Sequence, residues 1–246
     1  MGLQIKHLNK TFNGVTLFRD FHITFPEDRI TCILGPSGCG KTTLLNILGK
    51  TVPRDSGELI GFGEKLFSYI FQDPRLLPWK TVRGNIEFVM NRSMPASERK
   101  EKAAQLIRLV ELGNFAEYFP AQLSGGMRQR VSIARAFASP SDIILMDEPL
   151  NGLDVALKKN MIRWFTQIWE SDRRTVIFVT HDIDEALLLG DEIVVFSHPP
   201  VRILAHERFH EPVEKRRAGS PPFKRLKEKL IVALQTDRNP DHPAGG

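Results

Sequence analysis

The chain has 246 residues, of which 41% are hydrophobic and 26% are charged. These values are ordinary for a folded protein and exclude a chain that is disordered along most of its length. The formal net charge is +5, and the stretch from Val201 to the end holds ten Lys or Arg residues against six acidic ones. A positive surface of this kind attracts membrane headgroups, nucleic acid or nucleotides. Because most of the excess lies in this last stretch, the rest of the chain is nearly neutral.

Cysteine usage and hydropathy narrow the class of protein. The two cysteines, Cys32 and Cys39, are too close in sequence to predict a disulfide framework, so we expect a reducing compartment. The N-terminus lacks a basic segment followed by an apolar one, and no uncharged run approaches the roughly 18 residues that a membrane helix requires. We therefore expect a protein that is neither secreted nor membrane-spanning.

The predicted elements alternate between strands and helices. Residues 1–25 alternate apolar and polar side chains around Asn13-Gly14, which predicts a small antiparallel β subdomain. Later apolar runs predict buried strands at Ile30–Leu34, Phe67–Phe71, Ile143–Met146, Val176–Val179 and Ile193–Phe196. Helical patterns separate them, and residues 74–139 carry helices without a strand, which indicates an inserted helical subdomain. The predicted fold class is α/β with a mainly parallel sheet.

A phosphate loop follows the first of these apolar runs and precedes a helix expected over Thr43–Leu48. The pattern G-x-x-x-x-G-K-[ST] is matched by Gly35, Pro36, Ser37, Gly38, Cys39, Gly40, Lys41 and Thr42. Its glycines let successive N–H groups turn toward the phosphates of ATP, and the helix N-terminus adds partial positive charge. Lys41 would reach the β and γ phosphates, and Thr42 would offer its hydroxyl to Mg²⁺. For Cys39, a small spacer and a redox-sensitive thiol activated by Lys41 are both open.

Two carboxylates end the predicted strand Ile143–Met146. Asp147 and Glu148 follow it directly, and the carboxyl ends of parallel strands face the ligand crevice of such a sheet. Asp147 could hold the hydrated Mg²⁺, and Glu148 could polarise an attacking water. The alternative is a pair of acids at a solvated strand end.

A histidine follows the predicted strand Val176–Val179, as the carboxylates follow Ile143–Met146. His181 comes shortly after this strand, and Asp182 is expected to cap a helix that stops near Gly190. The cap would hold His181 at the same edge of the sheet as Lys41. An ordinary surface histidine is the alternative.

One more segment is not required by phosphate-loop chemistry in general. Leu123–Arg130 reads LSGGMRQR, in which Ser124 is a good N-cap and the glycines expose N–H groups at a helix start, a second anion site. Here the chain resembles the ATP-binding cassette (ABC) ATPases, whose signature motif this is. The phosphate loop, Gln72, the IILMDE strand, Gly152-Leu153-Asp154 and His181 stand in the order of that family. The resemblance covers Leu3 to Arg202 and implies an ABC ATPase domain over residues 1–204 with a phosphate-loop NTPase core.

The resemblance also implies roles for single residues. Phe12 is similar to the aromatic residue that stacks on adenine, although a place in the β core stays open. Gln72 resembles the residue that touches Mg²⁺ and the water, Glu148 the general base, and His181 the switch at the γ-phosphate. Outside the phosphate loop, the implied nucleotide-binding residues are Thr43, Ser124, Gly125, Gly126, Gln129 and Asp154, of which Asp154 crosses the seam of a dimer. That dimer, with a second copy or a homologous ATPase subunit, would sandwich two ATP molecules head to tail.

The segment after Gln72 is similar to that of the importer ATPases for nitrate, sulfonate, taurine and pyrimidine precursors, where it meets the coupling helix of a membrane permease. Leu76, Leu77 and Trp79 would be a solubility liability if uncovered, and filling the subdomain's own core is the alternative. The resemblance implies a permease and, indirectly, a solute-binding protein as partners, at the cytoplasmic face of the cell membrane. The cargo would be a small anion or organic solute such as nitrate, sulfonate, taurine or a thiamine precursor. The sequence departs from the group in its short stretch before Gln72 and in Pro149–Asp154.

The remaining residues, 205–246, form a basic C-terminal extension. Ser220-Pro221 followed by apolar positions at helical spacing predicts an amphipathic helix over residues 221–235, capped at Ser220. This helix either packs on its own domain or contacts anionic lipid or the permease.

Two other functions stay open at this point. A soluble ABC ATPase acting on DNA, ribosomes or iron–sulfur assembly would share the motifs, but such proteins usually carry paired cassettes or a long coiled-coil insertion, which the sequence lacks. A nucleotide-dependent interaction module that does not hydrolyse ATP would not need Glu148 and His181. The predicted function is ATP hydrolysis coupled to import, and nucleic acid is not an expected partner.

Overall fold

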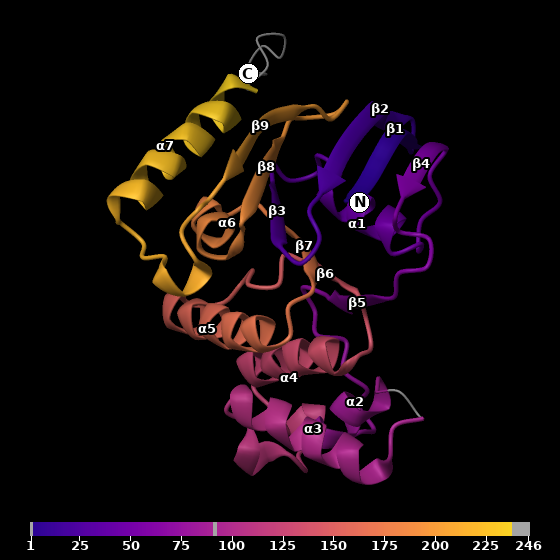
Figure 1. Cartoon of the computed structure of the whole chain (residues 1–246), viewed down its shortest axis with the longest axis vertical. Coiled ribbons are helices and arrows are strands. Elements are labelled where there is room, and N and C mark those ends of the chain that lie inside the picture. Colours follow the sequence, from indigo (N-terminus) through magenta and orange to yellow (C-terminus); the bar gives the residue numbers. More distant parts are fainter. Residues whose placement is uncertain (1, 91–92, 238–246) are drawn as a thin grey trace, which may run out of the picture. The chain divides into compact units, whose positions relative to one another are not determined.

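The computed structural model describes residues 2–90 and 93–237. The chain divides into two compact units, Met1–Glu64 with Ile177–Gly246, and Lys65–Val176 (Figure 1). Among the described residues, none of the helices combines the length and the apolar character that a bilayer crossing demands.

The first unit begins with a small antiparallel sheet. Its strands are β1 (Leu3–Phe12), β2 (Val15–Phe25) and β4 (Ser56–Ile60), in the order β2-β1-β4. Asn13 and Gly14, with φ of 50° and 80°, form the tight turn between β1 and β2, because positive φ values match the twist of a hairpin. The side chains of Leu3, Ile5 and Leu8 are buried on one face. The antiparallel element predicted for residues 1–25 is therefore confirmed, whereas β4 was not predicted.

The phosphate loop depends on other strands of this unit. These are β7 (Thr175–Thr180), β3 (Ile30–Leu34), β8 (Glu192–Phe196) and β9 (Ile203–Arg208), which are neighbours in that order. β3 and β8 are parallel, whereas β9 runs antiparallel to β8. All of β3 and β7 is buried, which explains why both read as continuous apolar runs. The helix after β3 is α1 (Lys41–Leu48), and the helix after β7 is α6 (Ile183–Leu189).

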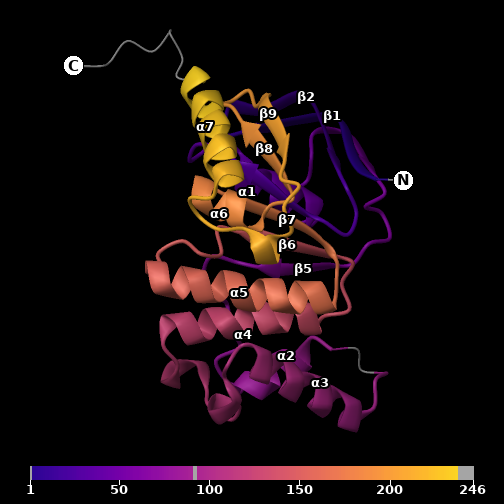
Figure 2. The ribbon, with the colours of Figure 1, turned by 60° about the vertical axis from the view of Figure 1, so that its left-hand side comes forward.

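The C-terminal segment packs within the same unit. Helix α7 (Pro221–Thr236) begins at its predicted cap Ser220 and lies along β9 and α6 (Figures 1 and 2). Arg216, 6% exposed, donates to the carbonyl of Gly190 at 2.8 Å and pairs with Asp191 at 2.8 Å. The other carboxylate oxygen of Asp191 accepts from the backbone N–H of Ile30. The described part of residues 205–246 is thus joined to the fold by a buried ion pair, which the sequence did not predict.

The second unit combines a pair of parallel strands with a stack of helices. β5 (Phe67–Ile70) pairs with β6 (Ile143–Asp147) in parallel. The helices are α2 (Val82–Phe88), α3 (Ala96–Leu109), α4 (Gly125–Ala138) and α5 (Val155–Ser171), with short 3-10 turns at Gly113–Phe115 and Pro120–Gln122. α4 lies between α5 on one side and α2 with α3 on the other (Figure 2). The strands and helices of both units confirm the predicted α/β class.

Candidate functional site

The phosphate loop joins the buried end of β3 to the start of α1. Gly38 and Gly40 adopt left-handed backbone conformations, with φ of 77° and 109°. Gly40 lies at the N-cap of α1, where an added Cβ would come within 3.3 Å of the Phe18 ring. Glycine therefore satisfies both the backbone conformation and the close packing at this position. The first N–H groups of α1 have no partners inside the helix and can bind an anion.

Lys41 is held over this loop by two carbonyl groups. Its side chain is buried, and its Nζ donates to the carbonyl oxygens of Gly35 at 2.8 Å and Pro36 at 2.9 Å. A buried ammonium group requires such partners, and their short distances fix its position. The loop therefore combines a fixed cation with backbone N–H donors, which is the chemistry that binds phosphate oxygens.

Cys39 lies inside the loop as a packed side chain. An added Cβ at Gly35 would meet the Cys39 Sγ and the Phe196 carbonyl, each at 3.1 Å. Burial raises the pKa of the Cys39 thiol, and the smaller opposing effect of Lys41 does not reverse this. A raised pKa lowers the thiolate fraction at neutral pH. Burial and the raised pKa therefore favour the spacer role of Cys39 over a thiol activated by Lys41.

The other residues of the first unit that were predicted to bind nucleotide lie in or beside the phosphate loop and at the end of β1. Thr42 is exposed and Thr43 half-buried in the first turn of α1, while Ser37 is exposed in the loop. Phe12 ends β1 and is 50% exposed, so a place in the β core does not describe it. Its exposed ring remains free to cover a flat ligand.

His181 follows β7, the strand next to β3, and its side chain is exposed. Asp182 caps α6, with its carboxylate accepting from the N–H of Asp184 at 2.8 Å and of Glu185 at 3.3 Å. Thr180 donates its hydroxyl to the buried Glu185 carboxylate at 2.7 Å and accepts from the N–H of Asp182. The cap predicted at Asp182 is confirmed, and it fixes the backbone on both sides of His181.

The two carboxylates of the second unit lie at the end of β6. Asp147 is the last residue of the strand, and Glu148 has a left-handed backbone with φ of 43°. Non-glycine residues rarely adopt this conformation, which turns Glu148 away from the line of the strand. Asn151 donates its side-chain amide to Glu148 Oε2 at 2.9 Å, and its N–H donates to the Glu148 carbonyl. The sequence analysis did not identify Asn151 as a partner of Glu148. An Asn three residues after Glu148 is typical of a turn and could have indicated this contact.

The signature segment begins α4. Ser124 is its N-cap and accepts from the N–H of Met127 at 3.2 Å, as predicted. Ser124 and Gly125 are exposed. An added Cβ at Gly126 would lie 2.5 Å from the end of the Leu157 side chain, because α4 and α5 pack closely here.

Gln129 has a different place from the one expected of a nucleotide ligand. Its side chain is 3% exposed, and its amide donates to the carbonyl of Pro149 at 2.8 Å and more weakly to that of Phe71 at 3.4 Å. It thus joins α4 to the segment after Glu148 and to the residue before Gln72. Direct contact with a nucleotide is therefore not supported, and Gln129 is a positioning residue instead.

Gln72 and Asp154 are both exposed. The segment around Gln72 is held by Arg135 of α4, which donates to the carbonyls of Pro74 and Arg75 at 2.8 and 2.9 Å. Asp154 is the N-cap of α5 and accepts from the N–H of Leu157 at 2.9 Å. Asp154 therefore has a structural role that the sequence analysis did not assign.

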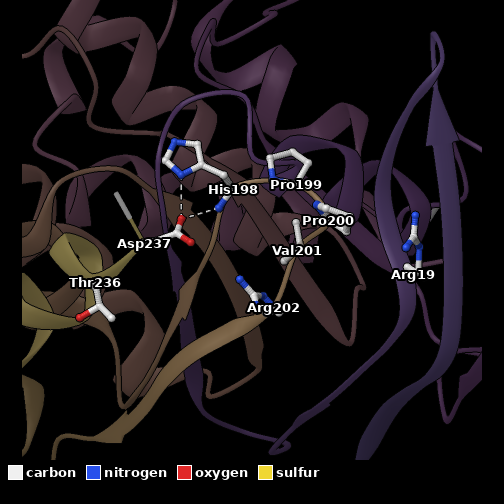
Figure 3. Close-up of a pocket in the computed structure, with 8 residues that line it drawn as sticks. All are labelled: Arg19, His198, Pro199, Pro200, Val201, Arg202, Thr236 and Asp237. Atoms are coloured by element: carbon white, nitrogen blue, oxygen red, sulfur yellow. Dashed lines mark hydrogen bonds and ion pairs between the residues drawn. The ribbon is translucent and has the colours of Figure 1, made fainter. Parts of the chain in front are cut away.

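A pocket of about 520 Å³ lies elsewhere in the first unit, between β2, α7 and the turn that links β8 to β9 (Figure 3). Asp237 lies beneath the His198 ring, and its carboxylate is 2.7 Å from Nδ1. The lining residues are Arg19, His198, Pro199, Pro200, Val201, Arg202, Thr236 and Asp237. None of them belongs to the phosphate loop, so this pocket does not coincide with the candidate phosphate site.

Comparison with known proteins identifies the family. Residues 18–151, a range that includes the phosphate loop, the signature segment and Glu148, match the family model described as ABC transporter. The chain belongs to the ABC transporter family. It is an ATPase of the ATP-binding cassette type, and the family resemblance predicted from its motifs is confirmed.

Two curated ABC relatives span most of this chain. It is 39% identical to the taurine import ATP-binding protein TauB of Rhizobium johnstonii over 225 residues, which cover 86% of each protein. It is 36% identical to the sulfate/thiosulfate import ATP-binding protein CysA of Acinetobacter baylyi over 222 residues, which cover 85% of this chain and 63% of CysA.

Solved ABC cassettes have the same fold. A dimeric post-hydrolysis state of the ATP-binding cassette MJ0796, bound to ADP and Pi, is 30% identical with a TM-score of 0.72, over 85% of this chain and 99% of that one. An inward-facing, putative metal-chelate type ABC transporter has a TM-score of 0.75 at 22% identity, over 96% of this chain and 89% of that one. At that identity the second structure supports the fold alone.

Proposed function

We propose that this protein is the ATP-hydrolysing subunit of an ABC importer and couples ATP binding and hydrolysis to solute movement through a separate permease. The observation that carries the ATPase chemistry is Lys41, held by two carbonyls over a loop that ends at a helix N-terminus. The importer assignment rests on the similarity to the taurine and sulfate import subunits.

In the proposed reaction, the Glu148 carboxylate takes a proton from a water whose oxygen attacks the γ-phosphorus. The bond from the γ-phosphorus to the bridging oxygen breaks, and ADP leaves with the bonding electron pair. Lys41 and His181 stabilise the negative charge of the transition state, and backbone N–H groups of the loop hold the phosphates. The left-handed backbone of Glu148 and its bond from Asn151 support this role, because both restrict where the carboxylate lies.

Mg²⁺ fits the oxygen donors present. The exposed Thr42 hydroxyl, the half-buried Asp147 carboxylate and the exposed Gln72 amide oxygen are hard ligands of the kind that Mg²⁺ prefers. When bound, Mg²⁺ would neutralise charge on the β and γ phosphate oxygens. We assign Thr42 and Asp147 to this ion, and Gln72 to the ion and the attacking water.

We further propose that the protein acts as a head-to-tail dimer. Ser124 and Gly125 form an exposed helix start with capacity for an anion, which a single phosphate loop does not require for its own nucleotide. The dimeric state of the MJ0796 cassette supports dimerisation. In the proposed dimer, Ser124, Gly125 and Gly126 of one copy would contact the γ-phosphate held by Lys41 of the other.

A permease contact is proposed at the segment after Gln72. Trp79 is 70% exposed and Phe88 is 56% exposed, and the ammonium of Lys80 lies 5.5 Å from the centre of the Phe88 ring. Large apolar side chains of this exposure indicate an interaction surface, and the core-filling alternative does not describe Trp79. Docking on a permease would place the protein at the cytoplasmic face of the cell membrane. The proposed cargo is a small anion or organic solute, such as taurine, another sulfonate or nitrate.

The test of hydrolysis is the Glu148→Gln variant, which keeps the shape of the side chain and removes the base. We expect phosphate release to fall by about 10²–10⁴-fold, while ATP binding persists and ATP-dependent dimers accumulate. Undiminished phosphate release in this variant would remove Glu148 from its role. The importer assignment is tested separately, by purifying the subunit from membranes and identifying a co-eluting permease.

A further inference from the structure

Three side chains that the ATPase chemistry does not use converge on the antiparallel sheet of the first unit. His7 of β1 and Asp20 and His22 of β2 form what we call the His–Asp cluster. His7 Nδ1 lies 2.7 Å and His22 Nε2 lies 3.3 Å from the same oxygen, Asp20 Oδ1. The rings of His7 and His22 meet edge to face with their centres 4.5 Å apart. The side chains are 67%, 66% and 46% exposed for His7, Asp20 and His22, so solvent ions can reach them.

Irregular pairing of β1 and β2 produces this convergence. The pairs Ile5–Ile23 and Leu8–Phe21 leave two residues of β1 opposite the single residue His22, which is a β-bulge. A second bulge places Asp20 and its neighbour on β2 opposite one residue of β1. His7 and Asp20 adopt left-handed backbones at these bulges, with φ of 51° and 49°. Regular pairing would alternate the side chains between faces, so the bulges re-aim them toward one point.

Neighbouring residues hold both bulges in place. The Asn9 amide donates to the carbonyl of His7 at 3.0 Å, and its oxygen accepts from the N–H of Asp20 at 2.9 Å. Gly57 of β4 lies so close that an added Cβ would be 2.6 Å from the His7 carbonyl oxygen. Left-handed conformations are unfavourable for non-glycine residues and persist where the surroundings enforce them. Strain of this kind is common at ligand sites.

The ligand set matches a transition-metal ion better than a hard cation. Zn²⁺ binds imidazole nitrogen and carboxylate oxygen at about 2.0–2.2 Å, which separates neighbouring ligand atoms by roughly 3.3 Å in a tetrahedron. One ligand atom from each of the three side chains lies within 4.8 Å of the others, so small side-chain rotations suffice.

We propose that His7, Asp20 and His22 bind a divalent transition-metal ion of the Zn²⁺ class through His7 Nδ1, Asp20 Oδ1 and His22 Nε2. A water molecule completes the coordination on the exposed side. Each ring binds the ion as neutral imidazole, so the ring proton of His7 lies on Nε2 and that of His22 lies on Nδ1 when the ion is bound. The contact of His22 Nδ1 with the His7 N–H is then lost. This contact is 3.4 Å long, so little is lost with it.

The proposal is tested by titrating the untagged full chain with zinc in the absence of nucleotide and measuring the binding by calorimetry. We expect one Zn²⁺ per chain at the His–Asp cluster and a higher Tm with Zn²⁺ than with chelator. His7→Asn and Asp20→Asn remove ligands while keeping a residue that tolerates the left-handed backbone, and His22→Gln removes the third. Each should weaken binding by at least about tenfold, since even outer-sphere partners of metal ligands contribute about that much.

His206→Gln is the matched control. His206 is an exposed histidine of the same unit that pairs with one carboxylate, Glu192, at 3.0 Å, and its strand β9 belongs to a different sheet from β1 and β2. This variant should bind zinc like the unaltered chain. Circular dichroism and Tm in the presence of chelator identify any ligand variant that fails to fold. Zinc binding by the ligand variants that do fold then decides whether the cluster is the metal site. Absence of zinc binding, or equal binding by the chain and its folded ligand variants, would overturn the proposal.

Discussion

The phosphate loop and the signature segment are both helix N-termini preceded by glycine or serine, yet they differ in how complete they are. At the phosphate loop, Lys41 is 5% exposed and its ammonium is bonded to two carbonyls of the loop itself. At the signature segment, Ser124 and Gly125 are exposed, and the Ser124 hydroxyl bonds only within the first turn of α4 among the contacts described. One chain therefore carries a complete anion site, the phosphate loop, and an incomplete one, the start of α4. We call them the finished and the unfinished site.

This difference has a physical cause. A fixed cation and several N–H groups bind a polyphosphate strongly, whereas a capped helix start supplies partial charge alone. The finished site should bind nucleotide in a single chain. The unfinished site should contribute only when another molecule brings a phosphate to it.

Lys41→Ala removes the cation of the phosphate loop and should slow hydrolysis more than the Ser124 and Cys39 substitutions. Loss of the ammonium removes the cation from the loop, so ATP binding should weaken strongly and phosphate release should fall by at least about 10²–10³-fold. Lys229→Gln, an exposed lysine of the same unit paired with Glu207, is the control and should retain both. Nucleotide titration and phosphate release measure the two effects, and wild-type binding by Lys41→Ala would contradict the assignment.

Ser124→Ala removes the capping hydroxyl of the signature segment. We expect phosphate release to fall by about tenfold or more, with ATP binding to the single chain unchanged, because in the proposed dimer this serine contacts the nucleotide of the partner copy. Lost capping should also lower the free energy of unfolding by about 1 kcal/mol.

Ser220→Ala separates the two effects of that substitution. Ser220 caps α7 and accepts from the N–H of Phe223, so its loss has a similar structural cost. It should destabilise the protein without slowing hydrolysis. Equal loss of hydrolysis in the two variants would assign the Ser124 effect to stability.

Substitution of Cys39 should change phosphate release little. The rate at which its thiol is alkylated reports how closed the phosphate loop is. Because burial raises its pKa, its thiolate fraction is below that of a free cysteine at every pH, and alkylation should rise only at more alkaline pH. Mass spectrometry after iodoacetamide treatment across a pH series measures this. Cys39→Ser should leave phosphate release within about twofold, since a side chain of similar size keeps the packing. Rapid alkylation at neutral pH would indicate a more open loop.

Local patterns account for what could be predicted. The turn at Asn13-Gly14, the phosphate loop between β3 and α1, and the caps at Ser124, Asp182 and Ser220 each depend on residues within a few positions of one another. Steric preferences and helix capping act over that range, so a contiguous stretch of sequence contains the necessary information.

Contacts between distant residues could not be predicted. Gln129 was expected at a nucleotide, but its amide is buried against Pro149, and Arg216 is buried against Asp191. Nothing in the spacing of these residues specifies the pairing. Such bonds form because folding buries their polar groups and makes unpaired ones costly.

The ATPase chemistry could be predicted from consecutive residues, because the phosphate loop, the carboxylates after β6 and the signature segment are each a short contiguous stretch. Which polar groups contact one another depends on the folding of distant segments. His7, Asp20 and His22 meet only because two bulges shift the register of β1 against β2, and a register shift depends on packing along the whole hairpin and on Gly57 of another strand. Local sequence specifies the residues, and long-range packing specifies their geometry.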